Sequence, residues 1–284
     1  MPLIVYPEYD GPKLKQHELI KGGLPNKTRV QKQRHNKEIH DIIKKINHYK
    51  LFFTPIEESV PVSITRGHAK YASNTTRQAG HQNISQYFAS QQTQSNLVSK
   101  IKDAHDYLLK SIKKLREHGI VHFDLRQNNI IMDSINHVPI ITDFDMAFVQ
   151  DQNIQIPSGI HPGWPLDVYL IAHAQKTPTM PITQDKLDEI TNQHNFPGEF
   201  KQKVDEFYKA YIGKPWQSLL PEQTTSPFTK DVLFTWDVYA LAVLFRFIIE
   251  DYAEKNTQTE NQAKLLAEYK QHLNKIIYSL PNER

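Results

Sequence analysis

"HGIVHFDLRQNNIIM" (residues 118–132) sets an aspartate, Asp124, between apolar residues, follows it with two asparagines, and closes with an apolar run. The segment "PIITDFDMAF" (139–148) comes soon after and places Asp143 between Thr142 and Phe144. Short apolar runs of this kind predict strands, and the polar residues between them predict turns. Two acids and an asparagine on short turns between apolar strands are typical of a functional site rather than of an ordinary surface.

Length and composition fit a soluble globular protein. The chain has 284 residues, of which 39% are hydrophobic and 23% charged, enough for one large domain or two small lobes. The net charge of +3 is too weak a bias to indicate specific nucleic-acid binding. The absence of cysteine excludes disulfides, zinc–thiolate sites and thiol nucleophiles, and it suits an intracellular protein.

No segment predicts secretion or membrane insertion. The first residues, "MPLIVYPEYDG", lack the basic region and the long apolar region of a secretory signal. The longest apolar stretch, "VYALAVLFRFII" (238–249), contains Arg246 and is about 12 residues long, which is too short to span a bilayer. We therefore expect no membrane insertion and an intracellular location.

The N-terminal third mixes short strands with one clear helix. Isoleucines recur at helical spacing between residues 36 and 49 and predict an amphipathic helix. The segment "LFFTPIEESVPVSI" (51–64) indicates two strands broken at Pro55. Residues 65–97 are polar and predict a connector around a small apolar anchor formed by Ile84, Tyr87 and Phe88.

The rest of the chain is mainly helical in its pattern. A helix with apolar positions from Ile101 to Leu115 is expected to end at Gly119. Residues 235–252 are apolar nearly all round, which is typical of a helix buried at the centre of a fold. Further helices are expected at 166–174 and 261–279, and within 175–230 with long connections.

The polar residues of the opening segments supply what phosphoryl transfer from a nucleotide requires. Asp124 can orient an acceptor hydroxyl and take its proton, and Arg126 can contact the γ-phosphate. Asn129 offers an amide oxygen and Asp143 a carboxylate, the hard oxygen ligands that Mg²⁺ prefers. The alternative interpretation is a pair of acidic turns that cap a hairpin.

The stretch resembles the protein-kinase superfamily, whose pattern is H-R-D-L-x-x-x-N followed by D-F-G. Residues 122–129 read H-F-D-L-R-Q-N-N and residues 143–145 read D-F-D, with Asp143 19 positions after Asp124. The resemblance implies ATP and Mg²⁺ as cofactors and an α+β, bilobal fold with a reduced N-lobe and a mainly helical C-lobe. The implied division is residues 1–65 for the N-lobe, 66–97 for a hinge or connector and 98–284 for the C-lobe.

The resemblance also implies a lysine that holds the α- and β-phosphates and pairs with a helical glutamate. Glu38 is the glutamate of helix 36–49, and Lys21 is the best lysine, with Lys15 and Lys27 as rivals. The glycine-rich phosphate loop of the family is missing, since Gly11 stands alone and the next glycines follow Lys21. Nucleotide affinity is therefore expected to be low, or another segment covers the site.

Two residues depart from the family pattern. Phe123 replaces an arginine that in the family usually binds a phosphate on the activation segment. This implies that activity does not depend on that phosphorylation. Asp145 replaces glycine, as is common in aminoglycoside and choline kinases. A cation at Arg126 is more similar to serine/threonine kinases, which place lysine there.

Downstream segments complete the resemblance. "GWPLDVYLIA" (163–172) is similar to the end of an activation segment, and Asp237 of the apolar helix is implied to hold the catalytic-loop backbone. Arg284 is implied to pair with Asp167. The rival assignment makes "DVYLIA" the central helix. "KLFFTPIEESVPVSI", "VHFDL" and "WPLDVYLI" are similar to serine/threonine protein kinases of large DNA viruses, of the African swine fever virus type.

The expected function is therefore ATP- and Mg²⁺-dependent phosphorylation of serine or threonine hydroxyls on protein substrates. If the source is viral, the protein would act in the host cytoplasm or the virion. One alternative is a catalytically weak pseudokinase scaffold that binds a protein partner, which the missing glycine loop favours. The other is a small-molecule phosphotransferase of the aminoglycoside or choline kinase type, which Asp145 favours.

Overall fold

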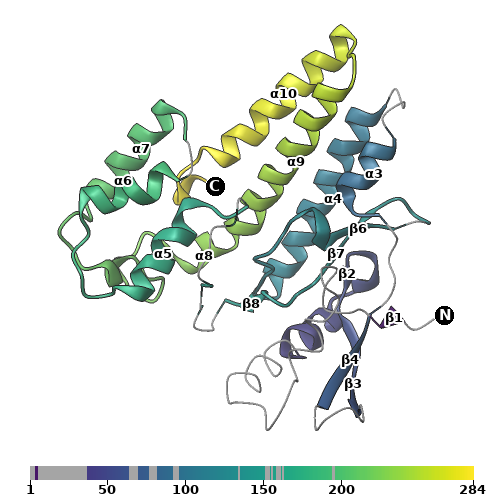
Figure 1. Cartoon of the computed structure of the whole chain (residues 1–284), viewed down its shortest axis with the longest axis horizontal. Helices are drawn as coiled ribbons and strands as arrows, with labels where there is room; N and C mark the ends of the chain where they lie inside the picture. The colour runs from purple at the N-terminus through teal and green to yellow at the C-terminus, as the bar shows by residue number, and fades with distance from the viewer. Residues whose placement is uncertain are drawn as a thin grey trace.

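The computed structural model describes residues 4–5, 37–63, 70–76, 82–91, 96–133, 135–150, 154, 156–157, 161, 163–193 and 196–284. The fold is α+β, with small sheets beside a larger set of helices (Figure 1). This confirms the expected fold class at that level.

The first sheet is antiparallel and has the order β1–β4–β3. Its strands are β1 (Ile4–Val5), β3 (Ile56–Ser63) and β4 (Lys70–Thr76). The short strand β2 (Phe53–Thr54) precedes β3, and Pro55 separates the two as predicted. Strand β4 lies inside the segment predicted as a connector, so the sequence analysis missed it. Its sequence, KYASNTT, lacks the apolar alternation that marks a half-buried strand.

The predicted helix near the N-terminus is confirmed, with residues 37–45 helical. Ile39, Ile43 and Ile46 are buried, with exposed fractions of 3% or less, and they join the main apolar core. A 3₁₀ turn, η1 (Tyr49–Leu51), leads from this helix toward β2. The helix therefore rests on its isoleucine face, as its spacing predicted.

A second sheet has the order β2–β7–β6 and carries the opening segments of the sequence. Strands β6 (Ile130–Met132) and β7 (Pro139–Thr142) form an antiparallel hairpin, and β2 adds parallel to β7. The two-stranded sheet of β5 (Ile120–Val121) and β8 (Phe148–Val149) closes the ends of the same stretch. All the short strands predicted between 118 and 142 are thus confirmed.

Four helices lie side by side and form the larger core (Figure 1). They are α3 (Ile84–Ser90), α4 (Leu97–Glu117), α9 (Thr235–Lys255) and α10 (Glu260–Ile277). Helix α4 ends before Gly119, whose φ of +72° is a left-handed conformation that glycine adopts without steric cost. The predicted anchor is confirmed, since Ile84 and Phe88 are buried in this core.

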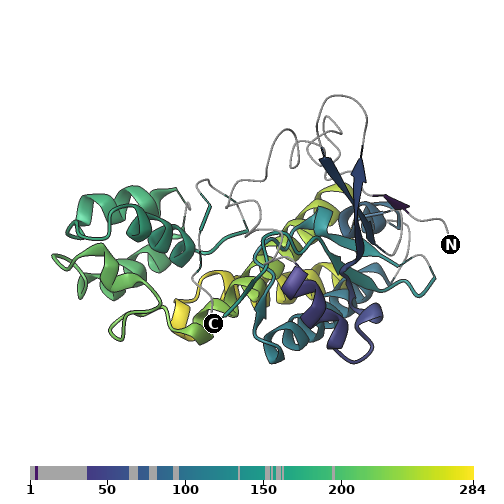
Figure 2. The same ribbon diagram turned by 90° about the horizontal axis from the view of Figure 1, so that it is seen from below.

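A separate apolar cluster is built by the helices between β8 and α9. They are α5 (Leu166–Lys176), α6 (Gln184–Asn192), α7 (Gly198–Lys209), the 3₁₀ turn η3 (Trp216–Leu219) and the short α8 (Lys230–Leu233). The 3₁₀ turn η4 (Pro281–Glu283) follows α10. Helices α6 and α7 lie at the end of the molecule away from β3 and β4 in both ribbon views (Figure 2). The predicted helical content of 175–230 is confirmed.

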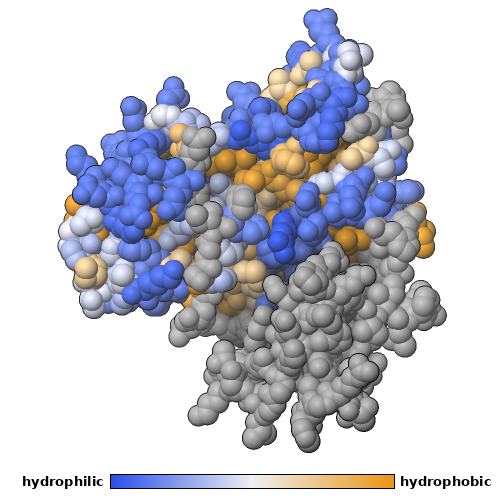
Figure 3. Space-filling view, in the orientation of Figure 1, coloured by the Kyte–Doolittle hydropathy of each residue, from blue (hydrophilic) through white to orange (hydrophobic). Residues whose placement is uncertain are grey.

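The apolar helix α9 corrects one argument from length. Residues Asp231–Lys255 are long and apolar enough to cross a membrane, so the estimate that this stretch is too short was wrong. Within this helix, 72% of the most apolar segment is buried inside the protein, as expected of a core helix. Figure 3 shows apolar surface over α9 between hydrophilic flanks. The absence of membrane insertion stays a prediction.

A buried histidine lies where α4, α9 and α10 meet. The ring of His105 is 4.7 Å from that of Phe245 and 5.8 Å from that of Tyr269, measured between centroids. Its exposed fraction is 1%, and burial lowers its pKa to about 4. The neutral ring is therefore the form that this apolar environment tolerates.

We predict that His105 makes the fold acid-labile. Between pH 6.5 and 4, His105 binds a proton in the unfolded chain but not in the folded chain. Its full contribution to the free energy of unfolding is therefore present above pH 6.5 and is lost as the pH falls below that value. Between pH 7.5 and 5, urea unfolding should show wild type losing on the order of 2 kcal/mol more than His105→Phe. His118→Gln, at an exposed site, is the control and should behave as wild type. Equal pH dependence in wild type and His105→Phe would contradict the assignment.

Candidate active site

The loop of residues 122–129 is held by one buried carboxylate. Asp237, in the first turn of α9, is 1% exposed. Its Oδ2 accepts the backbone N–H of His122 at 2.8 Å, and its Oδ1 accepts the backbone N–H of Phe123 at 2.9 Å. The implied role of Asp237 is confirmed, and the rival choice of 167–172 as the central helix is wrong.

The electrostatics of Asp237 balance burial against these two bonds. Burial raises the pKa of Asp237, while His122 and the two N–H groups oppose that rise. The start of a helix also favours a negative charge. The bonds thus offset part of the cost of burying the acid and fix two consecutive peptide groups.

Phe123, the residue after His122, is packed among aromatic side chains. Its φ is +68°, a left-handed conformation that is uncommon for a bulky residue and that marks the loop as held by its surroundings. Its ring stacks on Trp164 with centroids 4.7 Å apart and planes at 12°. Phe148 and Trp236 contact it at centroid distances of 5.7 and 5.3 Å. These three ring contacts fix the side chain of Phe123 in the loop.

His122 links the loop to the strand that leads to Asp143. Its Nε2 lies 2.9 Å from the carbonyl oxygen of Thr142, and the N–H of Asp124 donates to its Nδ1 at 3.3 Å. A carbonyl can only accept, so Nε2 carries the proton and Nδ1 accepts. The ring of His122 therefore connects the backbone before Asp143 with the backbone of Asp124.

The carboxylate of Asp124 is nearly buried and is contacted on both of its oxygens. Oδ2 accepts the side-chain amide of Asn129 at 2.8 Å and lies 3.3 Å from Nε of Arg126. Oδ1 lies 3.5 Å from Nε2 of His161. The structure thus brings together three of the predicted site residues and adds one that was not predicted.

Asn129 uses its nitrogen inside the loop. The same amide nitrogen donates to the backbone oxygen of Asp124 at 2.8 Å, across the 3₁₀ turn η2 (Gln127–Asn129). Because the nitrogen is committed, the amide oxygen is the atom that can serve as a ligand. Asn129 precedes Ile130, which pairs with Ile141, so the hairpin register sets Asn129 opposite Thr142. Asp143 is the next residue, at the same end of the hairpin.

Asp143 projects from a tight turn. Its φ is +59° and its side chain is exposed, and the N–H of Asp145 approaches its Oδ1 at 3.4 Å. Phe144 anchors this turn in the core and is 1% exposed. Its ring makes edge contacts with His122, His40 and Phe53 at centroid distances of 4.8, 6.1 and 6.0 Å. The packing of Phe144 sets where Asp143 leaves the core.

The donor set fits a cation that shares its ligands with a phosphate group. Among the residues that the structure describes, no group of three or more His, Cys, Asp or Glu side chains could hold a metal ion. Mg²⁺ needs only one or two protein carboxylates when phosphate oxygens and waters complete its shell. The amide oxygen of Asn129 and the carboxylate of Asp143 are chemically suited to that arrangement.

Lys21 and its rivals Lys15 and Lys27 lie outside the described residues. Glu38 lies in the helical segment 37–45 with an exposed side chain, while the buried face of that helix carries Ile39 and His40. The pairing of Glu38 with Lys21 stays a prediction.

Sequence reasoning missed the contribution of residues 161–164. The indole N–H of Trp164 donates to the backbone oxygen of Phe123 at 2.9 Å, and His161 reaches Asp124. Both residues are more than 30 positions from the loop, so no periodicity or spacing connects them to it. The only local signal was an aromatic residue and a histidine around a glycine and two prolines, in "HPGWP".

The predicted ion pair at the chain's last turn is confirmed. Nη2 of Arg284 lies 2.6 Å from Oδ1 of Asp167, and the side chains are 2% and 0% exposed. The indole N–H of Trp236 donates to Oδ2 of the same acid at 2.5 Å. Asp167 at the start of α5 is therefore tied both to α9 and to η4.

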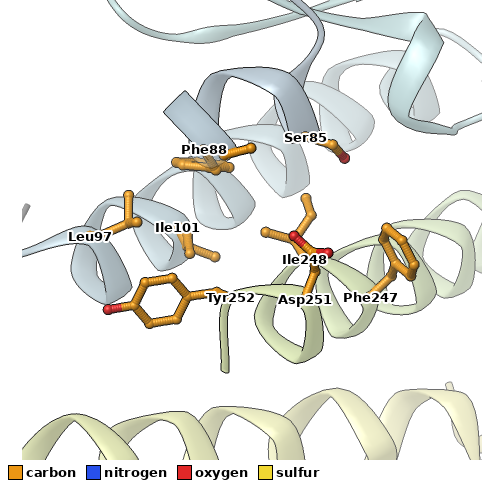
Figure 4. Close-up of a pocket in the computed structure, with 9 residues that line it drawn as sticks. Ser85, Phe88, Leu97, Ile101, Phe247, Ile248, Asp251 and Tyr252 are labelled. Atoms are coloured by element: carbon orange, nitrogen blue, oxygen red, sulfur yellow. The ribbon is translucent and has the colours of Figure 1, made fainter. Parts of the chain in front are cut away.

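An apolar hollow between α3, α4 and α9 is a poor rival for this site (Figure 4). Phe88, Ile101 and Tyr252 turn toward it, and Asp251 is its only charged lining residue. Its volume is about 20 Å³, room for a single water rather than a nucleotide. The chemistry that the sequence offers is concentrated at the loop instead.

Comparison with known proteins adds no family assignment. No protein-family model matches the chain, and no curated protein is significantly similar to it in sequence.

We predict that Asp237→Ala destabilises the protein by about 2–5 kcal/mol, because two buried N–H groups lose a charged acceptor. Asp237→Asn, which keeps one acceptor oxygen, should fall between this variant and wild type. Urea unfolding at neutral pH measures the difference. Asp231→Ala is the matched control: this acid is 82% exposed in its pair with Arg116, and its loss should cost about 1 kcal/mol or less. A small effect of Asp237→Ala would show that the loop is held by something else.

Proposed function

We propose that this protein is an ATP- and Mg²⁺-dependent kinase that phosphorylates serine or threonine hydroxyls of proteins. The proposal includes a two-lobed, kinase-like arrangement in which the strands near the N-terminus and helix 37–45 form the reduced lobe. The helices from α4 onward form the larger lobe. The ATP site lies between them, at the end of the β6–β7 hairpin.

One observation carries the proposal: a carboxylate, an amide and a second carboxylate are set at one end of a hairpin by independent contacts. Asp237 holds the loop, Asn129 binds the carboxylate of Asp124, and His122 ties the loop to the strand before Asp143. Surface turns that merely cap a hairpin do not need a buried acid to fix them. The observed tether from α9 therefore supports a catalytic loop over the capping alternative.

The proposed reaction moves one phosphoryl group. The hydroxyl oxygen of the substrate bonds to the γ-phosphorus as the bond from that phosphorus to the β,γ-bridging oxygen breaks, and ADP leaves. Asp124 accepts the hydroxyl proton. Arg126, half-exposed beside Asp124, faces the transferred group and offsets its negative charge.

The nucleotide and its cation would be held by the remaining residues. Asn129 and Asp143 are the proposed ligands of Mg²⁺, which when bound neutralises charge that develops on the phosphate oxygens. Lys21 is the proposed contact of the α- and β-phosphates, with Glu38 as its partner. The proposal requires no metal site built from protein side chains alone, in agreement with the donor set among the described residues.

Two residues of the site favour different acceptors. Arg126 favours a protein kinase, whereas Asp145 favours a small-molecule phosphotransferase. The side chain of Asp145 is half-buried, directly after the anchored Phe144. Its position in the site makes the small-molecule acceptor the second candidate.

We predict that the protein labels a basic protein substrate when it is incubated with γ-labelled ATP and Mg²⁺. Asp143→Ala should remove the label, because the cation loses its carboxylate ligand. Asp124→Asn should lower the rate by about 100-fold or more, because no base takes the proton. Glu206→Gln removes an exposed acid on α7 and is the control that should keep wild-type activity.

Three other outcomes would overturn parts of the proposal. Turnover only with an aminoglycoside or choline would favour the small-molecule enzyme. Turnover that survives Asp143→Ala would place the chemistry elsewhere or in a contaminant. Absence of turnover together with absence of a thermal shift by Mg·ATP would favour the scaffold.

A further inference from the structure

The segment of residues 161–164 is docked on the catalytic loop by several contacts that do not depend on one another. Trp164 stacks on Phe123 and donates its indole N–H to the backbone of that residue. The hydroxyl of Tyr169, on α5, accepts the N–H of His161 at 2.9 Å and donates to its carbonyl oxygen at 2.7 Å. Both polar groups of the His161 backbone are thus fixed by one side chain.

The ring of His161 is oriented as well as its backbone. The N–H of Gly163 donates to Nδ1 at 3.2 Å. Since Nδ1 accepts, the neutral ring carries its proton on Nε2, the atom 3.5 Å from Oδ1 of Asp124. Burial lowers the pKa of His161, with Arg126 acting in the same direction and Asp124 opposing it, so the neutral form is favoured at pH 7.

Gly163 makes room for this orientation. A Cβ built at this position would lie 3.2 Å from Cε1 and 3.3 Å from Nδ1 of His161. Contacts this short would force the ring to shift by a few tenths of an ångström. The glycine therefore permits the close packing of its own N–H against the imidazole.

From these contacts we propose that His161 is a positioning residue for Asp124, an inference that rests on the proposed function. Asn129 and Arg126 contact one oxygen of the carboxylate, and the Nε2–H group of His161 faces the other. The carboxylate is thereby held from both sides, which restricts its rotation. The distance of 3.5 Å is longer than a hydrogen bond, as is common for catalytic groups before substrate binds, and it shortens in the reacting complex.

The kinetic test compares three variants in the phosphorylation assay. His161→Ala should lower kcat by about 10- to 100-fold, because the base is misplaced, and leave the KM for ATP unchanged. His161→Gln should restore part of the loss, since its amide N–H can reach the same oxygen. Gly163→Ala should lower kcat in the same direction through displacement of the ring. Thermal unfolding of each variant checks that the fold is retained.

The second test needs no activity. Nitrogen-15 NMR of the imidazole should show His161 protonated at Nε2, and Asp124→Asn should shift that Nε2 resonance, while Glu206→Gln should not. An unshifted resonance, a proton on Nδ1, or a gain of kcat in His161→Ala would each overturn the proposal; the gain would mean that His161 blocks the base. A wild-type protein without phosphotransferase activity would refute the proposed function, and the NMR result would still decide the contact.

Discussion

The buried carboxylate of Asp237 is the interaction on which the rest of the site depends. It accepts two consecutive N–H groups of the loop, one from His122 and one from Phe123, and it does so from the first turn of α9. Removing water from an acid is costly, so such a residue persists only where its bonds are made well. Here these bonds fix the loop, and with it Asp124, relative to α9.

Aromatic packing also holds the loop that Asp237 fixes. Phe123 has a left-handed backbone conformation, and its ring stacks on Trp164. The indole N–H of Trp164 donates a hydrogen bond to the backbone oxygen of Phe123. Trp236, which lies beside Asp237 in sequence, contacts both Phe123 and Asp167. The loop, the segment before α5 and the start of α9 therefore form one packed unit.

Much of the fold and part of the site could be predicted because their signals are local or ordered along the chain. Helix 37–45, the hairpin of β6 and β7, and the apolar helix α9 follow from periodicity, and the roles of Asp237 and Arg284 follow from the resemblance. Strand β4 was missed because it pairs through its backbone while its side chains are polar. His161 was missed because only the folded chain brings it to Asp124. The length argument for α9 failed because the apolar helix extends beyond residues 238–249 on both sides.

The central claim is that Asn129 and Asp143 share a divalent cation beside a bound triphosphate. A crystal structure with Mg²⁺ and a non-hydrolysable ATP analogue tests it most directly. The account predicts one ion with Oδ1 of Asn129 and a carboxylate oxygen of Asp143 at about 2.0–2.1 Å, with phosphate oxygens completing its shell and Asp124 facing the γ-phosphate. An analogue bound away from the loop, or a cation that neither residue contacts, would contradict the account.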